Sequence, residues 1–238
     1  MHHYISNSPW SGPKVIKQAR TEIVWHPHFE VGSMLLGDES SEDRNGGVLV
    51  GGGRQYIGRL GKVDFGQTGV FLSIIKDCKH NWIDGELFLL EDWFDDDHKE
   101  LRQKTGVPDE RKFQTKIELF WQMLQRAQAE GVPFDAVACD GLYGRSFELR
   151  QKMDQAGIEF YADVPANTQV YLSEPKIGIP LNKRGRKAKK QTVLSPQPYF
   201  DNVTLGPRVV LDARFARTST VIQMMNNKRS SLQGREGR

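Results

Sequence analysis

The chain has 238 residues, of which 38% are hydrophobic and 10% aromatic, and this composition is sufficient for a hydrophobic core. It contains no run of about 18 apolar residues, and its first residues lack the apolar centre of a signal peptide. We therefore expect a cytoplasmic protein that does not interact with a membrane. Cys78 and Cys139 have neither the spacing of a zinc site nor the number of a disulfide framework, so we expect two buried, reduced thiols.

The formal net charge of +3 is the sum of two regions of opposite sign. Residues 1–172 contain 19 Lys and Arg against 26 Asp and Glu, whereas residues 173–238 contain 14 against 4. A DNA phosphate backbone is the natural partner of so basic a region, although a solvated tail without a ligand would have the same composition. The densest part, which we expect to be a DNA-contacting loop, contains Lys183, Arg184, Arg186, Lys187, Lys189 and Lys190.

The sequence predicts mainly β-structure in the first half of the chain. The apolar run 34–37 predicts a strand that ends at Asp38. The glycine-rich stretch 46–53 is typical of a hairpin or an irregular insertion. Two β-rich runs, 68–75 and 86–90, are separated by a polar stretch, and we expect them to form neighbouring antiparallel strands.

Helices and strands alternate in the next part of the chain. Apolar residues at helical spacing predict a helix over 113–127, which a glycine and a proline end. A short apolar strand over 134–139 leads directly into Asp140. A second helix is predicted over 146–157, with a serine at its N-cap and a glycine at its C-terminal end, before a last strand over 158–165.

Asp38 and Asp140 each follow the end of a predicted strand. If these strands are close in the sheet, both carboxylates lie at one edge, where a divalent cation would relieve their repulsion. Hard carboxylate oxygens suit Mg²⁺ or Mn²⁺, whereas imidazoles and thiolates would favour zinc. We therefore interpret Asp38 and Asp140 as candidate catalytic residues and metal ligands.

Seven short motifs in this order make the chain resemble the bacterial insertion-sequence transposases that have a DDE domain. They are His3-Tyr4-Ile5-Ser6-Asn7-Ser8-Pro9-Trp10, Leu35-Leu36-Gly37-Asp38-Glu39-Ser40, the segment 53–62, Asp84-Gly85-Glu86-Leu87, Gly131-Val132-Pro133-Phe134, Asp140-Gly141-Leu142-Tyr143-Gly144 and Val164-Pro165-Ala166-Asn167-Thr168. The resemblance implies an α/β fold, a ribonuclease H-like mixed sheet flanked by helices, here with a basic loop insertion. It also implies DNA cleavage and strand transfer by two Mg²⁺ ions held by three acids. Asp38 matches the first acid of the family, and Asp140 matches the second.

The resemblance places the third acid on a helix beyond a long insertion. No segment after residue 172 resembles that region, and we assign the role neither to Glu236 nor to its possible substitutes, Asp201 and Asp212. The expected organisation is a DDE domain over 1–172, a basic insertion or linker over 173–200, and a non-native or disordered tail over 201–238.

The expected function is DNA cleavage and strand transfer at transposon ends, with DNA as the partner and room for a homo-oligomer on it. Two alternatives remain open, a catalytically incomplete DNA-binding remnant and a non-transposing nuclease of the same fold. Because the third carboxylate is unassigned, we expect this chain to bind DNA without completing transposition.

A glycine-rich ribbon over 53–62 is a second candidate DNA contact. Arg54, Arg59 and Lys62 lie around Tyr56 there, so that cations can meet phosphates while the aromatic ring stacks on a splayed base. A purely structural hairpin with solvent-facing cations would have the same sequence.

Overall fold

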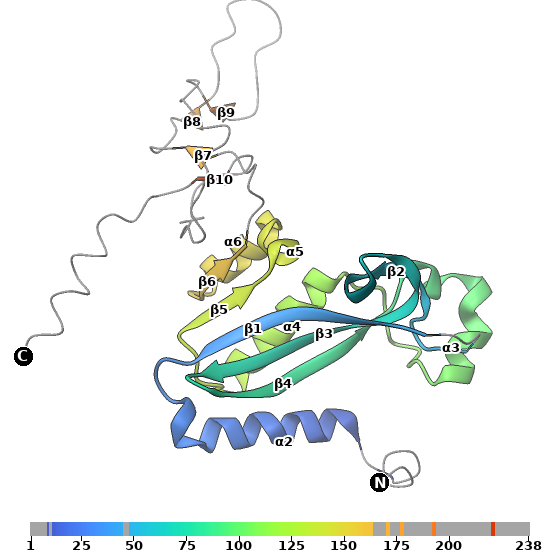
Figure 1. The fold of residues 1–238 in the computed structure, drawn as a ribbon, viewed down its shortest axis with the longest axis horizontal. Coiled ribbons are helices and arrows are strands. Elements are labelled where there is room, and N and C mark those ends of the chain that lie inside the picture. Colours follow the sequence, from blue (N-terminus) through green and yellow to red (C-terminus); the bar gives the residue numbers. More distant parts are fainter. Residues whose placement is uncertain are drawn as a thin grey trace, which may run out of the picture.

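The computed structural model describes residues 11–44 and 48–163, together with Pro9 and four two-residue strands beyond Asp163. Elements are labelled as in Figure 1. None of the helices in this part of the chain is long and apolar enough to cross a membrane.

A six-stranded mixed sheet forms the centre of the described chain (Figure 1). With β2 left aside, the strand order is β4-β3-β1-β5-β6. β1 pairs antiparallel with β3, and β3 pairs antiparallel with β2 and β4, whereas β1, β5 and β6 are parallel. The ribonuclease H-like sheet predicted from the sequence is thereby confirmed. The strands are β1 (Met34–Asp43), β2 (Gly53–Ile57), β3 (Lys62–Lys76), β4 (Lys79–Phe88), β5 (Ala136–Cys139) and β6 (Glu159–Ala162).

Helices cover one face of this sheet. Buried residues of α2, α4 and α6 share a single core with the inward-facing residues of β1 and β3, such as Leu35 and Leu72. The principal helix, α4, begins at a capping box in which Thr115 and Glu118 bond each other's backbone N–H groups. The helices are α2 (Gly12–Trp25), α3 (Lys99–Thr105), α4 (Lys116–Ala129), α5 (Gly141–Gly144) and α6 (Phe147–Gln155).

Short 3₁₀ turns connect several of these elements. η1 (Pro27–Phe29) precedes β1, and η2 (Gly58–Leu60) connects β2 to β3. η3 (Glu91–Phe94) and η4 (Asp96–His98) lead from β4 into α3. Trp93 of η3 is buried with Leu89 and Val107 in a small second core.

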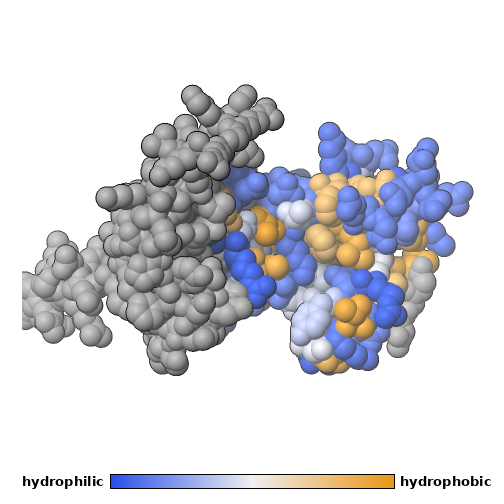
Figure 2. Space-filling view, turned by 90° about the horizontal axis from the view of Figure 1, so that it is seen from above, coloured by the Kyte–Doolittle hydropathy of each residue, from blue (hydrophilic) through white to orange (hydrophobic). Residues whose placement is uncertain are grey.

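The opposite face of the sheet is more exposed. On this face Phe71 of β3 packs edge-on against Trp82 of β4, with ring centroids 4.9 Å apart, and 59% of Trp82 is exposed. Tyr56 and Val63 are also exposed, on the hairpin that β2 and β3 form. Seen from above, the described surface is largely hydrophilic, and its hydrophobic residues form separate patches (Figure 2).

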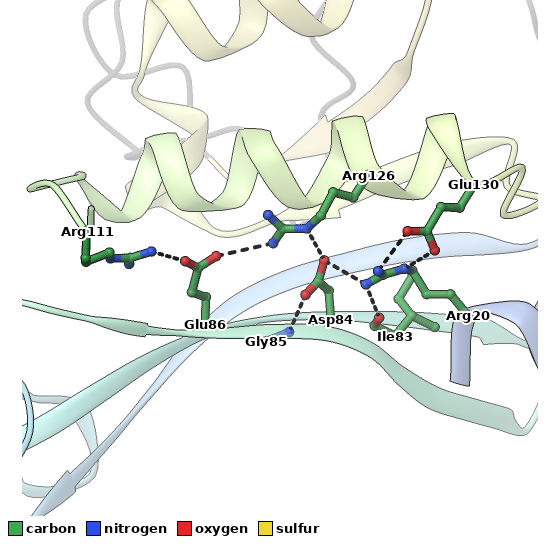
Figure 3. A network of polar contacts seen from close by, with 8 residues as sticks. All are labelled: Arg20, Ile83, Asp84, Gly85, Glu86, Arg111, Arg126 and Glu130. Carbon is green, nitrogen blue, oxygen red and sulfur yellow. Dashed lines mark hydrogen bonds and ion pairs between the residues drawn. The ribbon is translucent and has the colours of Figure 1, made fainter. Parts of the chain in front are cut away.

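A network of ion pairs joins α2, β4 and α4 in the layer between β4 and α4 (Figure 3). Asp84 of β4 accepts from Arg126 at 2.8 Å and lies 3.1 Å from Arg20, and both Asp84 and Arg20 are buried. Arg20 also binds both carboxylate oxygens of Glu130, at 2.6 and 3.0 Å. Glu86 extends the network by pairing with Arg126 and with Arg111.

The sequence prediction that the first strand ends at Asp38 is wrong. β1 continues to Asp43, because β3 begins as early as Lys62 and its first half pairs with residues 39–43 of β1. Gly37 lies within β1 and pairs with Leu72 and Cys139. A Cβ atom there would lie 1.9 Å from the ring of Phe120, so glycine is what allows α4 to pack on β1.

Two further expectations need correction. The polar stretch before residue 86 belongs to β4, which begins at Lys79 after a tight turn in which Asp77 has a φ of 54°. Cys78 lies in this turn and is exposed, whereas Cys139 is buried, as expected, and both are free thiols. The predicted N-cap at Ser146 is confirmed by its hydrogen bond from the Leu149 N–H.

Beyond Asp163 the described residues form two small pairings. β7 (Val170–Tyr171) is parallel to β10 (Thr220–Val221), and β8 (Ile177–Gly178) is antiparallel to β9 (Thr192–Val193). The basic stretch 183–190 lies in the chain between β8 and β9 but outside the described residues. Asp201, Asp212 and Glu236 also lie outside them.

Candidate active site

The register of β1 against β5 brings Asp38 and Asp140 together. The parallel pairing runs from Met34 beside Ala136 to Gly37 beside Cys139. Asp38 follows Gly37 within β1, and Asp140 is the first residue after β5, so the two aspartates are neighbours. Oxygens of Asp38, Asp140 and a third acid, Glu39, all lie within 4.8 Å of one another. The two predicted residues therefore meet at the edge of the sheet where β5 ends.

Backbone N–H groups orient one oxygen of each aspartate. Asp38 Oδ1 accepts from the N–H of Glu39 at 2.8 Å. Asp140 is the N-cap of α5, and its Oδ1 accepts from the N–H groups of Leu142 and Tyr143 at 2.9 and 3.4 Å. The second oxygen of each carboxylate has no hydrogen bond from the described residues, so it is available to a cation.

The electrostatic environment disfavours charge on Asp38. Protein atoms around the carboxylate raise its pKa above the usual 3.8, and the negative charge of Asp140 raises it further. The hydrogen bond from the Glu39 N–H and the charge of Lys116 act in the opposite direction. A bound cation would offset both unfavourable effects.

Glu39 occupies the site together with two residues from other elements. Its Oε1 lies 3.3 Å from Nζ of Lys116, in the first turn of α4. Its Oε2 and the hydroxyl of Tyr143 are both buried, and neither has a hydrogen-bond partner in the described part of the chain. Burial strongly raises the pKa of Tyr143, and the charges of Glu39, Asp140 and Asp38 raise it further, so this hydroxyl stays protonated close to all three acids.

Two aromatic side chains of the core pack against the residues that carry the site. Phe120 of α4 lies against Gly37, and its ring centroid is 4.7 Å from that of Tyr143. Both aromatic side chains are fully buried. The strand that carries Asp38 and the turn that carries Asp140 are thus fixed against the same helix.

The donor set suits a hard cation. Three carboxylates supply oxygen ligands only, which is the preference of Mg²⁺, Mn²⁺ or Ca²⁺. Burial raises the pKa of the neighbouring Cys139 thiol to about 12, and the charge of Asp140 contributes, so this thiol remains protonated at neutral pH.

Sequence reasoning missed three residues of this site. Glu39 directly follows Asp38, and Tyr143 lies within the motif that begins at Asp140, so both were near recognised signals. Strand alternation places Glu39 on the opposite face from Asp38, however, so its position in the sequence does not predict a shared site. Nothing local in the sequence marks Lys116, which lies 77 residues from Glu39.

The cations of the predicted DNA-binding ribbon lie on the hairpin of β2 and β3, away from the acids. Arg59 pairs with Asp43, and Lys62 Nζ lies 2.8 Å from Asp64, all four side chains being well exposed. Arg54 has no ion-pair partner among the described residues. Exposed pairs of this kind contribute little stability, so phosphates can compete for these cations.

A mixed sheet with acidic residues from its two adjacent parallel strands places the chain in the class of ribonuclease H-like proteins. The sequence profile of the family described as DDE superfamily endonuclease matches residues 1–202, and the chain belongs to this family.

One curated relative is the probable transposase for insertion sequence element IS701 of Microchaete diplosiphon. It is 26% identical over 174 residues, which are 72% of this chain and 42% of the relative. The chain thus spans less than half the length of that relative.

Proposed function

We propose that this chain contains the catalytic domain of a DDE-type transposase, which cleaves DNA at transposon ends and joins it to a target. The observation that carries the proposal is the meeting of Asp38, Glu39 and Asp140 within 4.8 Å at the edge of the parallel strands. Membership of the DDE endonuclease family and the similarity to a probable transposase support the same chemistry.

Asp38 and Asp140 would hold Mg²⁺ or Mn²⁺ through the carboxylate oxygens that their backbone hydrogen bonds leave available. When bound, such a cation activates the attacking oxygen of water or of a DNA 3′-hydroxyl and stabilises charge on the leaving oxygen. The N–H donors orient one oxygen of each aspartate and leave the other oxygen available to the cation.

The hairpin cations are proposed to contact the DNA. In the register of the sheet, Asp38 is opposite Phe71 and Arg54 is opposite Phe65, and both phenylalanines point to the same side of β3. The two phenylalanines are six positions apart on β3, which corresponds to about 20 Å at a rise of about 3.4 Å per residue. A duplex with its scissile phosphate at Asp38 would therefore meet Arg54 about six base pairs away.

The domain organisation expected from the sequence is part of this proposal. Residues 1–172 would carry the catalytic acids, and 173–200 would supply a basic segment whose lysines and arginines neutralise phosphates. Residues 201–238 would be a tail. Because a transposon has two ends, we include in the proposal a homo-oligomer that forms on DNA.

A cleavage assay on the full chain tests the function. With Mg²⁺ or Mn²⁺ and a duplex that carries a transposon end, nicking of the DNA and joining of the new 3′-end to a target duplex by the wild-type protein would establish the function and overturn the expectation that the chain binds DNA without completing transposition. Asp38→Asn and Asp140→Asn should each lower the rate on the order of 10²-fold or more, because a cation ligand is lost.

Glu42→Gln is the matched control, since Glu42 is exposed on the same strand and lies outside the acid cluster. This variant should cut DNA as fast as the wild-type protein. DNA binding without metal-dependent cutting by the wild-type chain would identify a DNA-binding remnant instead. Cutting without joining would identify a nuclease that does not transpose.

Binding measurements test the hairpin separately. Arg54→Ala should weaken binding to all DNA sequences alike and lower the slope of log affinity against log salt by about 0.9. Loss of affinity for only some sequences would indicate base contacts and contradict a phosphate role.

A further inference from the structure

We propose that Arg150 of α6 binds a backbone phosphate of the DNA beside the acid cluster. The proposal rests on the proposed function, because it adds a contact for the DNA strand that Asp38 and Asp140 would cleave. Arg150 is distant in the sequence from the cations of the β2–β3 hairpin and from the basic stretch 183–190. It would therefore hold the DNA independently of those two segments.

The short helix that follows Asp140 brings the guanidinium of Arg150 close to the acids. Asp140 is the N-cap of α5, and its carbonyl accepts from the N–H of Gly144 at 2.9 Å, so one helical turn separates the two residues. Nη1 of Arg150 donates to the carbonyl of Gly144, at the other end of that turn. One turn of α-helix is about 5.4 Å long, and the phosphates of a DNA strand advance by about 3.4 Å along the duplex axis. A strand with its scissile phosphate at Asp140 can therefore present a phosphate to Arg150 within about three nucleotides.

Two contacts orient the guanidinium before any DNA is bound. Besides its hydrogen bond to Gly144, it lies over the ring of Phe147, with Cζ 6.0 Å from the ring centroid. The side chain is half-buried, and Nε has no hydrogen-bond partner among the described residues. Gly144 is the only acceptor that the described chain offers to this guanidinium, so most of its five N–H donors are without a partner there. A preoriented arginine with unused donors is suited to bind a phosphate.

No acid of the described chain balances the charge of Arg150. Burial lowers the pKa of Arg150, and no carboxylate acts in the opposite direction. Arg126 of α4 is also half-buried, but there Asp84 and Glu86 outweigh the effect of burial and raise the pKa. An arginine keeps its proton at neutral pH, so Arg150 is a partly buried cation without a counter-ion in this part of the chain. A DNA phosphate would supply the missing negative charge.

DNA binding by the full chain at several salt concentrations tests the proposal, with a fluorescein-labelled duplex as the probe and no divalent cation present. Arg150→Gln removes the charge, so we expect the affinity to fall by about tenfold and the slope of log affinity against log salt to decrease by about 0.9. Lys152→Gln is the matched control, because it removes an exposed cation from the opposite side of the same helix. This control should bind DNA as the wild type does. A wild-type salt slope in Arg150→Gln would overturn the proposal.

The salt slope carries the test because a change of packing alone does not alter the number of counterions that the DNA releases. Should Arg150→Gln fail to fold, Arg150→Met serves instead, since its unbranched apolar side chain needs no hydrogen-bond partner. An unchanged slope in Arg150→Met would then overturn the proposal.

The cleavage assay keeps this proposal separate from the proposed function. If Asp38→Asn and Asp140→Asn abolish metal-dependent cutting while Arg150→Gln retains the wild-type slope, Arg150 is not a DNA contact and the proposed function stands. If the wild-type chain does not bind the duplex at all, both proposals are wrong.

Discussion

Two clusters of charged side chains each include a residue of α4, and they are organised in opposite ways. In the network of Figure 3, three arginines meet three acids, and Asp84 pairs with both Arg20 and Arg126. At the candidate active site, Lys116 is the only cation of the described chain that pairs with one of the three acids. The first cluster is neutral, whereas the second has a surplus of negative charge.

We infer from this difference that the neutral network stabilises the fold, whereas the acids of the candidate site can bind a cation. Asp84 uses both of its oxygens, one for Arg20 and Arg126 and the other for the N–H of Gly85. Asp38 and Asp140 each use one oxygen on backbone N–H groups and keep the other available. Removing a member of the neutral network should therefore destabilise the protein, whereas removing a member of the site should abolish ligand binding.

The largest effect on stability is expected for Asp84→Asn. The substitution leaves Arg20 and Arg126 without their shared carboxylate in a buried setting, and the free energy of unfolding should fall by about 3 to 5 kcal/mol. Urea denaturation followed by circular dichroism measures it. Asp43→Asn, which removes one partner of an exposed pair with Arg59, is the control and should change stability by less than about 0.5 kcal/mol. Equal losses of stability in Asp84→Asn and Asp43→Asn would contradict a stabilising role of the buried network.

Addition of Mn²⁺ should stabilise the protein through the acid cluster alone. At a concentration of about 100 times Kd, the free energy of unfolding should rise by about 2.7 kcal/mol, since the folded state alone presents the assembled site. Thermal denaturation with and without Mn²⁺ measures this. Asp140→Asn should remove the effect, whereas Asp43→Asn should retain it. A stabilisation that persists in Asp140→Asn would place the cation elsewhere.

Gly37→Ala tests whether packing under the site sets its geometry. The new methyl group would overlap the ring of Phe120, so we expect a loss of about 1 to 3 kcal/mol together with weaker Mn²⁺ binding. Gly58→Ala is the matched control, because no atom lies within 4 Å of a Cβ atom there. Unfolding curves and Mn²⁺ titrations of both variants measure the two effects. Full stability in Gly37→Ala would show that α4 can shift at no cost.

The smallest expected effect is the dependence of protein stability on pH. The raised pKa of Asp38 means that the folded state holds this proton more tightly than the unfolded state, so stability is lost as pH rises from about 3.8 through the raised value. In metal-free buffer at pH 7, Asp38→Asn should therefore be slightly more stable than the wild type, and the difference should shrink as pH falls toward 4. A hydrogen bond from Arg20 lowers the pKa of Glu130, which contributes in the opposite direction, as stability present above 4.5 and lost on acidification. Unfolding curves across this pH range measure how the free energy of unfolding changes with pH in the wild type and in Asp38→Asn. If the stability difference between these two proteins grows toward pH 4, the raised pKa of Asp38 is contradicted.

Local signals in the sequence were sufficient for much of the fold. Apolar spacing located α4, and the capping residue Ser146 located the start of α6 to within one residue. The same signals placed Asp38 at the end of its strand, because the polar residues after it do not look like a strand. Pairing with β3 keeps residues 39–43 extended, and such pairing is not a local property.

The sequence by itself determined the order of β1, β3, β4, α4, β5, α6 and β6, the N-cap of α6 and the two aspartates that follow apolar runs, but it did not predict α2 or α3. Only the tertiary structure decided which charges meet. Arg20 reaches Glu130 across 110 residues, and Lys116 reaches Glu39 across 77. Such contacts depend on strand register and on the packing of α4 against the sheet, which arise from burying the whole core at once. For the same reason Glu39 was recognised beside the two aspartates only when the end of β5 and the continuation of β1 were seen together.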